Sequence, residues 1–459
     1  MTRHDSTLEP KGVAPATRPV LSPGQRPERV PVSYGQRRLW FIDRLGGSNA
    51  EYNVVEGLRF QGPLDTAALE RALNAIVARH ESLRTRFDEA AGEPFQIVER
   101  ELRIEVPSHD LTHLPEQEQR DYIDAAIDRH AAEPFSLSRG PVLRFALFKL
   151  AGDEHVLLRC MHHIVSDGWS QDIFHRELLA LDEAFSHDRP DPLRPLPIQF
   201  TDFALWQRQW LDAGALSHGL EYWTRQLAGI SGRLDLLTGK PRPASQTFDA
   251  GVHEIYLSAI QLERLKLLSR QGYSTLYMTL LTGVGVLLSR YSGQEDIVIG
   301  SPVGNRQDAQ LEGMIGFFVN MLAMRVQPAP GLRVSEYLNQ VRNTALEAYR
   351  HQETPFERLV EELAPKRSLN TTPLFQVSFA LQNTPAQDEP GHVTRLPLRE
   401  RHVRFDLEIN AREENGQLRC RWLYNRGLFE AWHIEQMAEH LTTVLEGLAA
   451  NPDRSASYG

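Results

Sequence analysis

The amino-acid sequence predicts a mixed α/β fold that is divided into two parts. Segments in which apolar residues alternate, typical of half-buried strands, are interspersed with segments in which they recur every three or four residues, typical of amphipathic helices. The chain has 459 residues, which is long for a single hydrophobic core. A stretch rich in proline, aspartate and arginine at residues 186–197 is the best candidate for a boundary between the two parts.

The two patterns place the strands and helices in order along the chain. In the first part we expect strands near residues 53–60, 143–150 and 155–161, and helices that begin near residues 33, 65 and 170. In the second part we expect strands at 296–302, 375–381, 403–409 and 418–424, and helices at 200–207, 258–268, 276–288 and 434–445 and after Pro355. The turn at residues 413–416 joins the last two strands as a hairpin.

Composition excludes several classes of function. The formal net charge is −10 and the sequence pI is about 6.0, so there is no basic surface for nucleic acid or for an anionic membrane. The most apolar run, residues 276–288, is interrupted by polar and small residues and is shorter than the ~20 apolar residues that a membrane-spanning helix needs. It is interpreted as a buried core helix.

The terminal segments and the two cysteines bear on the cellular compartment of the protein. Residues 1–30 are rich in proline, serine, threonine and charge and lack the apolar core of a secretory signal, so we expect a linker or a loosely attached arm. Residues 451–459 read as the start of a second linker. Cys160 and Cys420 fall at apolar positions of predicted strands, as buried thiols in a reducing compartment do. A cytoplasmic location is therefore expected.

Residues 159–170 contain the pattern with the clearest chemical meaning. A strand leads into His162 and His163, whose side chains must point to opposite faces if the strand continues, so that one is free for chemistry and the other for packing. Asp167 lies in a Ser-Asp-Gly turn, and Ser170 is a plausible N-cap of the next helix. A histidine held at such a corner suits proton transfer near neutral pH. The alternatives are two core histidines and, more weakly, a metal site, which lacks further ligands at suitable spacing.

This pattern, two histidines followed after three residues by Asp-Gly-Trp-Ser, resembles the signature of the condensation domains of nonribosomal peptide synthetases. Six further segments resemble other motifs of that family in the family's order, although Gly35 replaces an alanine and Phe200 a tyrosine; they lie at residues 33–41, 79–87, 200–207, 315–320, 351–360 and 373–379. Epimerisation, heterocyclisation and inactive recruitment domains depart from the central pattern in ways that are absent here. The resemblance therefore implies an intact amide-forming domain.

The resemblance also implies an architecture. Two lobes similar to chloramphenicol acetyltransferase, at residues 31–185 and 198–450, would form a V with a central tunnel, and 186–197 would join them. Residues 1–30 look like the linker that follows an upstream carrier domain in a larger synthetase.

The resembled reaction joins an acyl or peptidyl thioester on an upstream carrier to the amine of an aminoacyl thioester on a downstream carrier. His163 would take the amine's proton or hold the amine, and His162 would support it. Gly168 would give the backbone room and present an amide to the developing oxyanion. Asp167 would form a structural ion pair with Arg84 or Arg86, for which the alternative is a solvated surface arginine. Trp169, Ser301 and Asn320 are candidates for contact with substrate in the tunnel, although Asn320 could equally be a satisfied core residue.

The implied partners follow from the same resemblance. They are a donor and an acceptor carrier domain with phosphopantetheine arms and an adjacent adenylation domain, around a monomeric unit without a bound cofactor or metal. Neither nucleic acid nor membrane is expected. Two other functions stay open: a non-catalytic module that docks carriers or recruits other enzymes, and a stand-alone acyltransferase that uses a diffusible acceptor.

Overall fold

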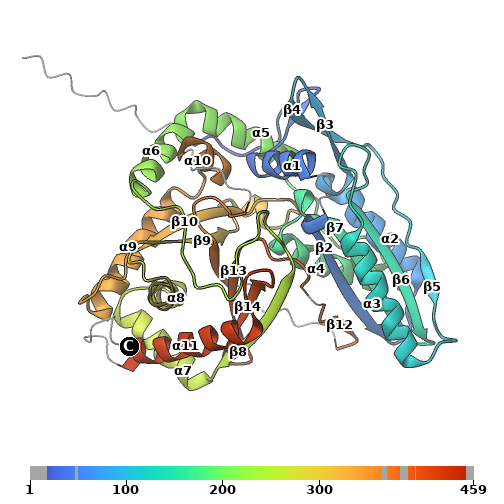
Figure 1. The fold of residues 1–459 in the computed structure, drawn as a ribbon. Coiled ribbons are helices and arrows are strands. Elements are labelled where there is room, and N and C mark those ends of the chain that lie inside the picture. Colours follow the sequence, from blue (N-terminus) through green and yellow to red (C-terminus); the bar gives the residue numbers. More distant parts are fainter. Residues whose placement is uncertain (1–17, 47–49, 364–369, 383–390, 399, 451–459) are drawn as a thin grey trace, which may run out of the picture.

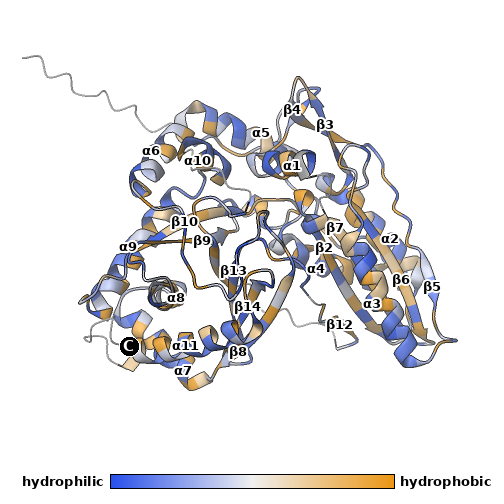
Figure 2. Cartoon of the chain, viewed as in Figure 1, coloured by the Kyte–Doolittle hydropathy of each residue, from blue (hydrophilic) through white to orange (hydrophobic). Residues whose placement is uncertain are grey.

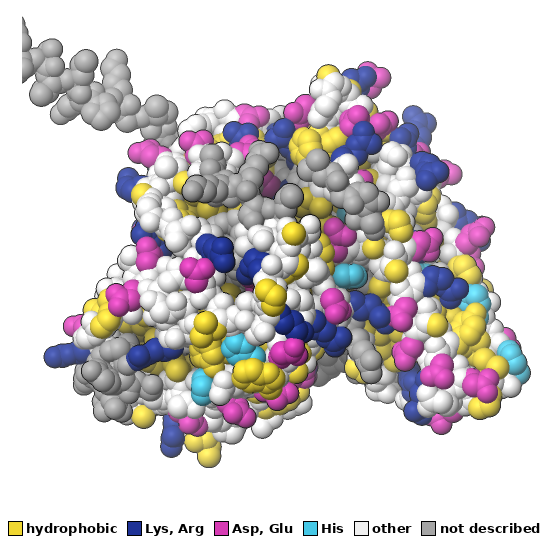
Figure 3. All heavy atoms as spheres, in the orientation of Figure 1, with side chains coloured by type: hydrophobic (Ala, Val, Ile, Leu, Met, Phe, Trp, Pro, Cys, Tyr) yellow, Lys and Arg dark blue, Asp and Glu magenta, His cyan; other side chains and the backbone are white. Residues whose placement is uncertain are grey.

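The computed structural model describes residues 18–46, 50–363, 370–382, 391–398 and 400–450. Within them, two large mixed sheets lie side by side, each with helices packed against it, and a small sheet flanks the first (Figure 1). Strongly apolar residues line the strands and the helix faces that meet them (Figure 2). The space-filling view shows a notch between the two bodies at its lower edge (Figure 3).

The first large sheet has strand order β12-β2-β7-β6-β5 among the described residues, and all its neighbours are antiparallel except β5 and β6. Its strands are β12 (Val393–Arg395), β2 (Asn53–Gln61), β7 (Glu154–His162), β6 (Leu143–Ala151) and β5 (Ser108–Asp110). Helices α2 (Thr66–Arg79) and α4 (Gly168–Phe185) share a core with one face, and α3 (Glu116–Ala132) packs on the other. The strands predicted at 53–60, 143–150 and 155–161 are confirmed, as is the N-cap at Asp65.

The second large sheet has strand order β10-β9-β11-β13-β14-β8 among the described residues, with β9, β11 and β13 parallel. Its strands are β10 (Asn320–Val326), β9 (Ile297–Val303), β11 (Val377–Gln382), β13 (Leu407–Glu414), β14 (Gln417–Asn425) and β8 (Ala250–Leu257). A single large core joins it to α7 (Ala259–Gln271), α8 (Leu276–Ser292), α9 (Val334–Arg350) and α11 (Ala431–Ala450). The structure confirms the buried helix predicted at residues 276–288, the hairpin turn predicted at 413–416 and the capping box at Ser258.

The remaining elements flank the first sheet, lie where the two bodies meet or pack on the core of the second sheet (Figure 1). The helices are α1 (Tyr34–Gly46), α5 (Phe200–Trp210), α6 (Leu216–Gln226), α10 (Phe356–Leu363), the π-helix Leu211–Ala215 and short 3-10 helices at Ala50–Tyr52, Glu81–Arg84, His163–Val165 and Ala309–Leu311. The small sheet consists of β1 (Val30–Pro31), β4 (Glu93–Val98) and β3 (Thr85–Ala90). Within the described ranges no single helix is long and apolar enough to cross a bilayer, although the bent pair α7 and α8 passes together on length and composition.

Two segments cross the boundary predicted at residues 186–197. Strand β12 comes from the second half of the chain but adds to the edge of the first sheet, where Thr394 pairs with Arg59 of β2. The loop at residues 304–319, between β9 and β10, also reaches the first half, where the hydroxyl of Ser82 donates to the carbonyl of Ile315 at 2.7 Å. Both segments therefore pack across the boundary predicted at residues 186–197.

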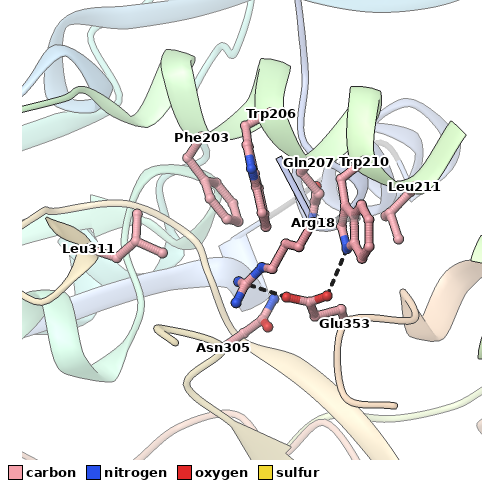
Figure 4. A pocket seen from close by; sticks show the side chains of 9 residues that line it. All are labelled: Arg18, Phe203, Trp206, Gln207, Trp210, Leu211, Asn305, Leu311 and Glu353. Carbon is pink, nitrogen blue, oxygen red and sulfur yellow. Dashed lines mark hydrogen bonds and ion pairs between the residues drawn. The ribbon is translucent and has the colours of Figure 1, made fainter. Parts of the chain in front are cut away.

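The described part of the N-terminal arm is docked, contrary to the expectation of loose attachment. Leu21 is only 4 % exposed and belongs to a core cluster with α5 and the loop that precedes β10. The guanidinium of Arg18 pairs with Glu353 at 2.8 Å and lies 4.9 Å from the ring centre of Trp206 (Figure 4). Arg26 pairs with both Glu81 and Asp202, at 2.7 and 3.1 Å. Proline and charge in this segment suggested a linker, but its few apolar and arginine side chains find partners on both halves.

Candidate functional site

The histidine motif lies where strand β7 ends and helix α4 begins. β7 ends at His162, a 3-10 turn covers His163–Val165, and α4 begins at Gly168. Asp167 is the N-cap of α4, because its Oδ1 accepts a hydrogen bond from the N–H of Ser170 at 2.9 Å. The N-cap predicted at Ser170 is therefore wrong. The hydroxyl of Ser170 instead donates to Asp167, at 2.7 Å.

The two histidine side chains diverge, as expected for adjacent residues at the end of a strand. His162 is fully buried, and its Nδ1 accepts a hydrogen bond from the N–H of Ile164 at 3.0 Å. His163 is partly exposed, and its Nδ1 lies 2.7 Å from the carbonyl oxygen of Ser166. A carbonyl only accepts, so Nδ1 of His163 carries the proton and a neutral ring has its free lone pair on Nε2.

Both imidazoles are neutral at pH 7. Burial lowers the pKa of His163 to about 3, and the positive charge of Arg404 acts in the same direction. Burial likewise lowers the pKa of His162 to about 3. The ring of Phe317 stands edge-on to His163 at 5.5 Å between ring centres. The site therefore presents an unprotonated imidazole nitrogen beside apolar surroundings.

The carboxylate of Asp167 organises the corner from within the protein. It is fully buried and accepts hydrogen bonds from the N–H and hydroxyl of Ser170, from the N–H of Phe318 at 3.1 Å, and from Nη2 of Arg306 at 3.2 Å. Arg306 also donates to the carbonyls of Leu311 and Met314, and its guanidinium lies 3.9 Å from the ring centre of Phe318. The pair fastens the loop between β9 and β10 to the N-terminus of α4.

The prediction that Asp167 pairs with Arg84 or Arg86 is wrong. Arg84 donates to the carbonyl of Glu99 and lies 3.7 Å from Glu81, and Arg86 pairs with Glu99 at 2.8 Å. Both arginines therefore contact Glu99, which follows strand β4 of the small flanking sheet. Sequence reasoning missed Arg306, because it stands alone in a turn of the other half and nothing local indicates which buried carboxylate it meets.

Gly168 and Trp169 are exposed at the start of α4. A Cβ built on Gly168 would meet no protein atom within 4 Å, and the residue has no positive φ that requires glycine. Trp169 is 40 % exposed, and its indole N–H donates to the carbonyl of Glu312 at 3.0 Å. Both placements are consistent with the expectation that this face is left free for a substrate.

The other two candidates, Ser301 and Asn320, lie apart from the motif on β9 and β10. The hydroxyl of Ser301 accepts a hydrogen bond from Tyr277 at 2.7 Å, and it lines a cavity of about 450 Å³ at the carboxyl ends of β9, β11 and β13. The amide of Asn320 donates to the carbonyls of Gln352 and Thr354 and accepts from the N–H of Phe356, at 2.7–3.0 Å. Its hydrogen bonds are used within the protein, which favours the structural alternative for this residue.

Comparison with known proteins decides the family. A protein-family model described as Condensation domain matches residues 27–458. The chain belongs to the condensation-domain family. Amide-bond formation between carrier-bound substrates is the characteristic reaction of this family, and its catalytic members are acyltransferases. Within the described residues of this condensation domain, no group of three or more His, Cys, Asp or Glu side chains could hold a metal ion.

The relatives and solved structures agree with this assignment. This condensation domain is 41 % identical over 440 residues to a linear gramicidin synthase of Brevibacillus parabrevis, covering 95 % of the chain and 6 % of that protein. It is 39 % identical over 433 residues to phosphinothricin tripeptide synthetase PhsC of Streptomyces viridochromogenes, covering 92 % of the chain and 39 % of that protein. It therefore spans only part of these multidomain relatives.

Among solved structures, the X-domain from teicoplanin biosynthesis matches with a TM-score of 0.85 and 29 % identity, covering 96 % of this chain and 99 % of that one. The condensation domain of the Monacolin K polyketide synthase MokA matches with a TM-score of 0.80 and 22 % identity, covering 93 % and 98 %. These matches confirm the predicted fold, which resembles chloramphenicol acetyltransferase.

Proposed function

We propose that this condensation domain joins an acyl or peptidyl thioester on an upstream carrier to the amine of an aminoacyl thioester on a downstream carrier, with His163 at the reacting amine. One observation carries the assignment. Nδ1 of His163 is held by the carbonyl of Ser166, which leaves Nε2 as a hydrogen-bond acceptor on a partly exposed ring.

The chemistry requires no external energy source. The amine nitrogen attacks the thioester carbonyl, a C–N bond forms, the C–S bond breaks, and the sulfur leaves with the proton that the nitrogen loses. A neutral imidazole accepts a hydrogen bond from the amine and orients its lone pair toward the carbonyl. A pKa of about 3 makes His163 a weak base. This low pKa supports a role in holding and orienting the amine more than in removing its proton early.

We assign the oxyanion to the N-terminus of α4. The backbone N–H of Gly168 is the first of this helix, and the first amides of a helix have no acceptor within it. An N–H aimed at the developing negative charge is an effective way to stabilise a tetrahedral intermediate. The exposure of Gly168 at the first position of α4 supports this placement.

The proposed partners are a donor carrier, an acceptor carrier and an adjacent adenylation domain. The substrates would arrive on phosphopantetheine arms, with no cofactor or metal bound by this domain itself. Support comes from the multidomain relatives and from a four-domain nonribosomal peptide synthetase that matches with a TM-score of 0.83. The two free, buried cysteines, Cys160 and Cys420, support a cytoplasmic location.

One observation favours the docking alternative. The X-domain from teicoplanin biosynthesis, solved in complex with OxyB, matches this chain with a TM-score of 0.87 and 28 % identity. Inactive recruitment domains of this family typically lose the second histidine, whereas His163 is present here. The presence of His163 argues for catalysis, and the experiment below distinguishes catalysis from docking.

The decisive experiment measures carrier-bound products by mass spectrometry. Wild-type protein with a loaded donor and a loaded acceptor carrier should give an amide on the acceptor, and His163→Ala should lower turnover by about 10² to 10⁴-fold. His109→Ala, on the edge strand β5, is the control. Transfer only to free amines would instead support the stand-alone acyltransferase, and no transfer at all would support docking.

A further inference from the structure

A line of polar side chains, most of them buried, connects β2, β7 and α4 behind the histidine corner. Arg159 on β7 is 5 % exposed and faces Glu56, its cross-strand partner on β2. Nη2 of Arg159 donates to Glu56 and also to Oε1 of Gln171, which is 6 % exposed in the first turns of α4. The guanidinium lies 4.0 Å from the ring centre of Phe174. Glu56, Gln171 and Phe174 lie outside the stretch 159–170 that holds the histidine motif, and none of the four residues takes part in the Asp167–Arg306 pair.

The line continues from Gln171 into the loop that holds His163. Nε2 of Gln171 donates to the hydroxyl of Ser166 at 2.8 Å. Ser166 is fully buried, its N–H donates to the carbonyl of His163 at 3.1 Å, and its own carbonyl accepts from Nδ1 of that histidine at 2.7 Å. The polar line therefore ends at the atom that fixes the tautomer of His163.

The orientation of the Gln171 amide follows from its partners. Arginine only donates, so the atom of Gln171 that meets Arg159 must be the oxygen, and the nitrogen must then face Ser166. Asparagine or glutamate at this position could not both reach Arg159 and donate to the hydroxyl of Ser166. A buried network of this kind holds one arrangement when it is complete and is costly when one member is missing.

We propose that Gln171, anchored by Arg159, is a positioning residue of the reaction centre. It fixes Ser166, and through the Ser166 carbonyl it fixes both the tautomer and the direction of the His163 ring. This inference rests on the proposed function, because it assigns Nε2 of His163 to the reacting amine. The Asp167–Arg306 pair holds the next residue of the same loop, so the corner is supported from two sides.

The test replaces Gln171 by methionine, which has a similar volume and cannot make either hydrogen bond. The control is Gln119→Met in α3, because the amide of Gln119 is likewise used within the protein, where it donates to the carbonyls of Leu111, Leu114 and Leu150, but the residue lies far along the chain from the motif. With loaded carriers, Gln171→Met should lower kcat about tenfold or more with an unchanged KM, since small displacements of a positioning group are costly to rate. Gln119→Met should keep the wild-type kcat.

A second readout does not depend on the reaction. In protein labelled with ¹⁵N-histidine, with the His163 signals assigned by their loss in His163→Ala, the wild type should show the Nδ1–H tautomer and Gln171→Met a mixture. Ser166→Ala should reproduce the effect, and the double variant should be no worse than either single one. An unchanged tautomer, or equal losses of kcat in Gln171→Met and Gln119→Met, would overturn the proposal. A wild-type protein that forms no amide would instead overturn the proposed function, while the tautomer still tests the role of Gln171.

Discussion

At the scale of single residues, two adjacent histidines with the same chemistry are held in opposite states. Nδ1 of His162 accepts a backbone N–H, so its neutral ring carries the proton on Nε2, whereas Nδ1 of His163 faces a carbonyl and carries the proton itself. Strand geometry predicts that the two rings diverge. It cannot predict the tautomers, because both partners belong to the turn that follows the strand.

The low pKa of His163 leads to a prediction for the pH dependence of the reaction. Its ring stays neutral from pH 9 down to pH 5, because its pKa is about 3. The rate should therefore rise with pH along a single limb set by the acceptor amine, for which an α-amino pKa of about 8 is the reference. Single-turnover rates between pH 5 and 9 test this. A second limb near pH 6.5 that disappears in His163→Gln would show instead that His163 titrates during catalysis.

At the scale of elements, the loop between β9 and β10 is fastened to α4 by one buried ion pair. Arg306→Met would leave the carboxylate of Asp167 buried without its cation, which costs about 3–5 kcal/mol of folding free energy. Arg86→Met breaks a pair whose two side chains are 32 % and 45 % exposed, and an exposed pair contributes about 1 kcal/mol at most. Urea unfolding of both variants gives the comparison, and equal losses would contradict the role assigned to Arg306.

The same loop shows where prediction from sequence ends. Alternating and helical patterns predict β2, β6, β7, β14 and most helices, because each pattern reflects burial of one face of one element. Arg306 and β12 escape this reasoning, since their partners lie far away in the chain: Asp167 in one case and Arg59 of β2 in the other. A polar residue in a turn carries no local sign of the carboxylate that it will meet.

The docked arm gives a second prediction at this scale. Leu21 is buried in the cluster with α5, and its neighbour Val20 is 84 % exposed. Leu21→Ala should lower the free energy of unfolding by about 2–5 kcal/mol. Val20→Ala should change it by less than about 0.5 kcal/mol. Denaturant midpoints of the two variants would decide the matter, and similar midpoints would mean that the arm contributes nothing to folding stability.

At the scale of the whole molecule, the two sheets share segments instead of standing apart. β12 extends the first sheet from the second half of the chain, the loop at 304–319 reaches back to α4, and the arm pairs with both halves through Arg18 and Arg26. The polar centre at His163 is built at this junction. Protonation of the neutral histidines at this junction would therefore lower the folding stability of the whole chain.

This coupling predicts how stability depends on pH. Burial lowers the pKa of His162 and His163 to about 3 and of His175 to about 4, whereas an unfolded histidine has a pKa of about 6.5. At pH values between the folded pKa and the unfolded pKa of these histidines, the unfolded chain binds more protons than the folded one. The free energy of unfolding therefore falls as the pH drops below about 6.5. Each histidine contributes a slope of about 1.4 kcal/mol per pH unit. Asp182, whose pKa burial raises to about 6, opposes this trend, because its folded form protonates first.

The histidines with depressed pKa values, of which His162, His163 and His175 are shifted most, outnumber the carboxyls with raised ones, so a net loss of stability toward acid is expected in urea unfolding at pH 7, 6 and 5. His162→Gln removes one of these histidines and should flatten the dependence by about 1.4 kcal/mol per pH unit. His113→Gln, at an exposed position, should leave it unchanged. If both variants keep the wild-type slope, acid unfolding starts elsewhere in the molecule, and the imidazoles at the junction do not control it.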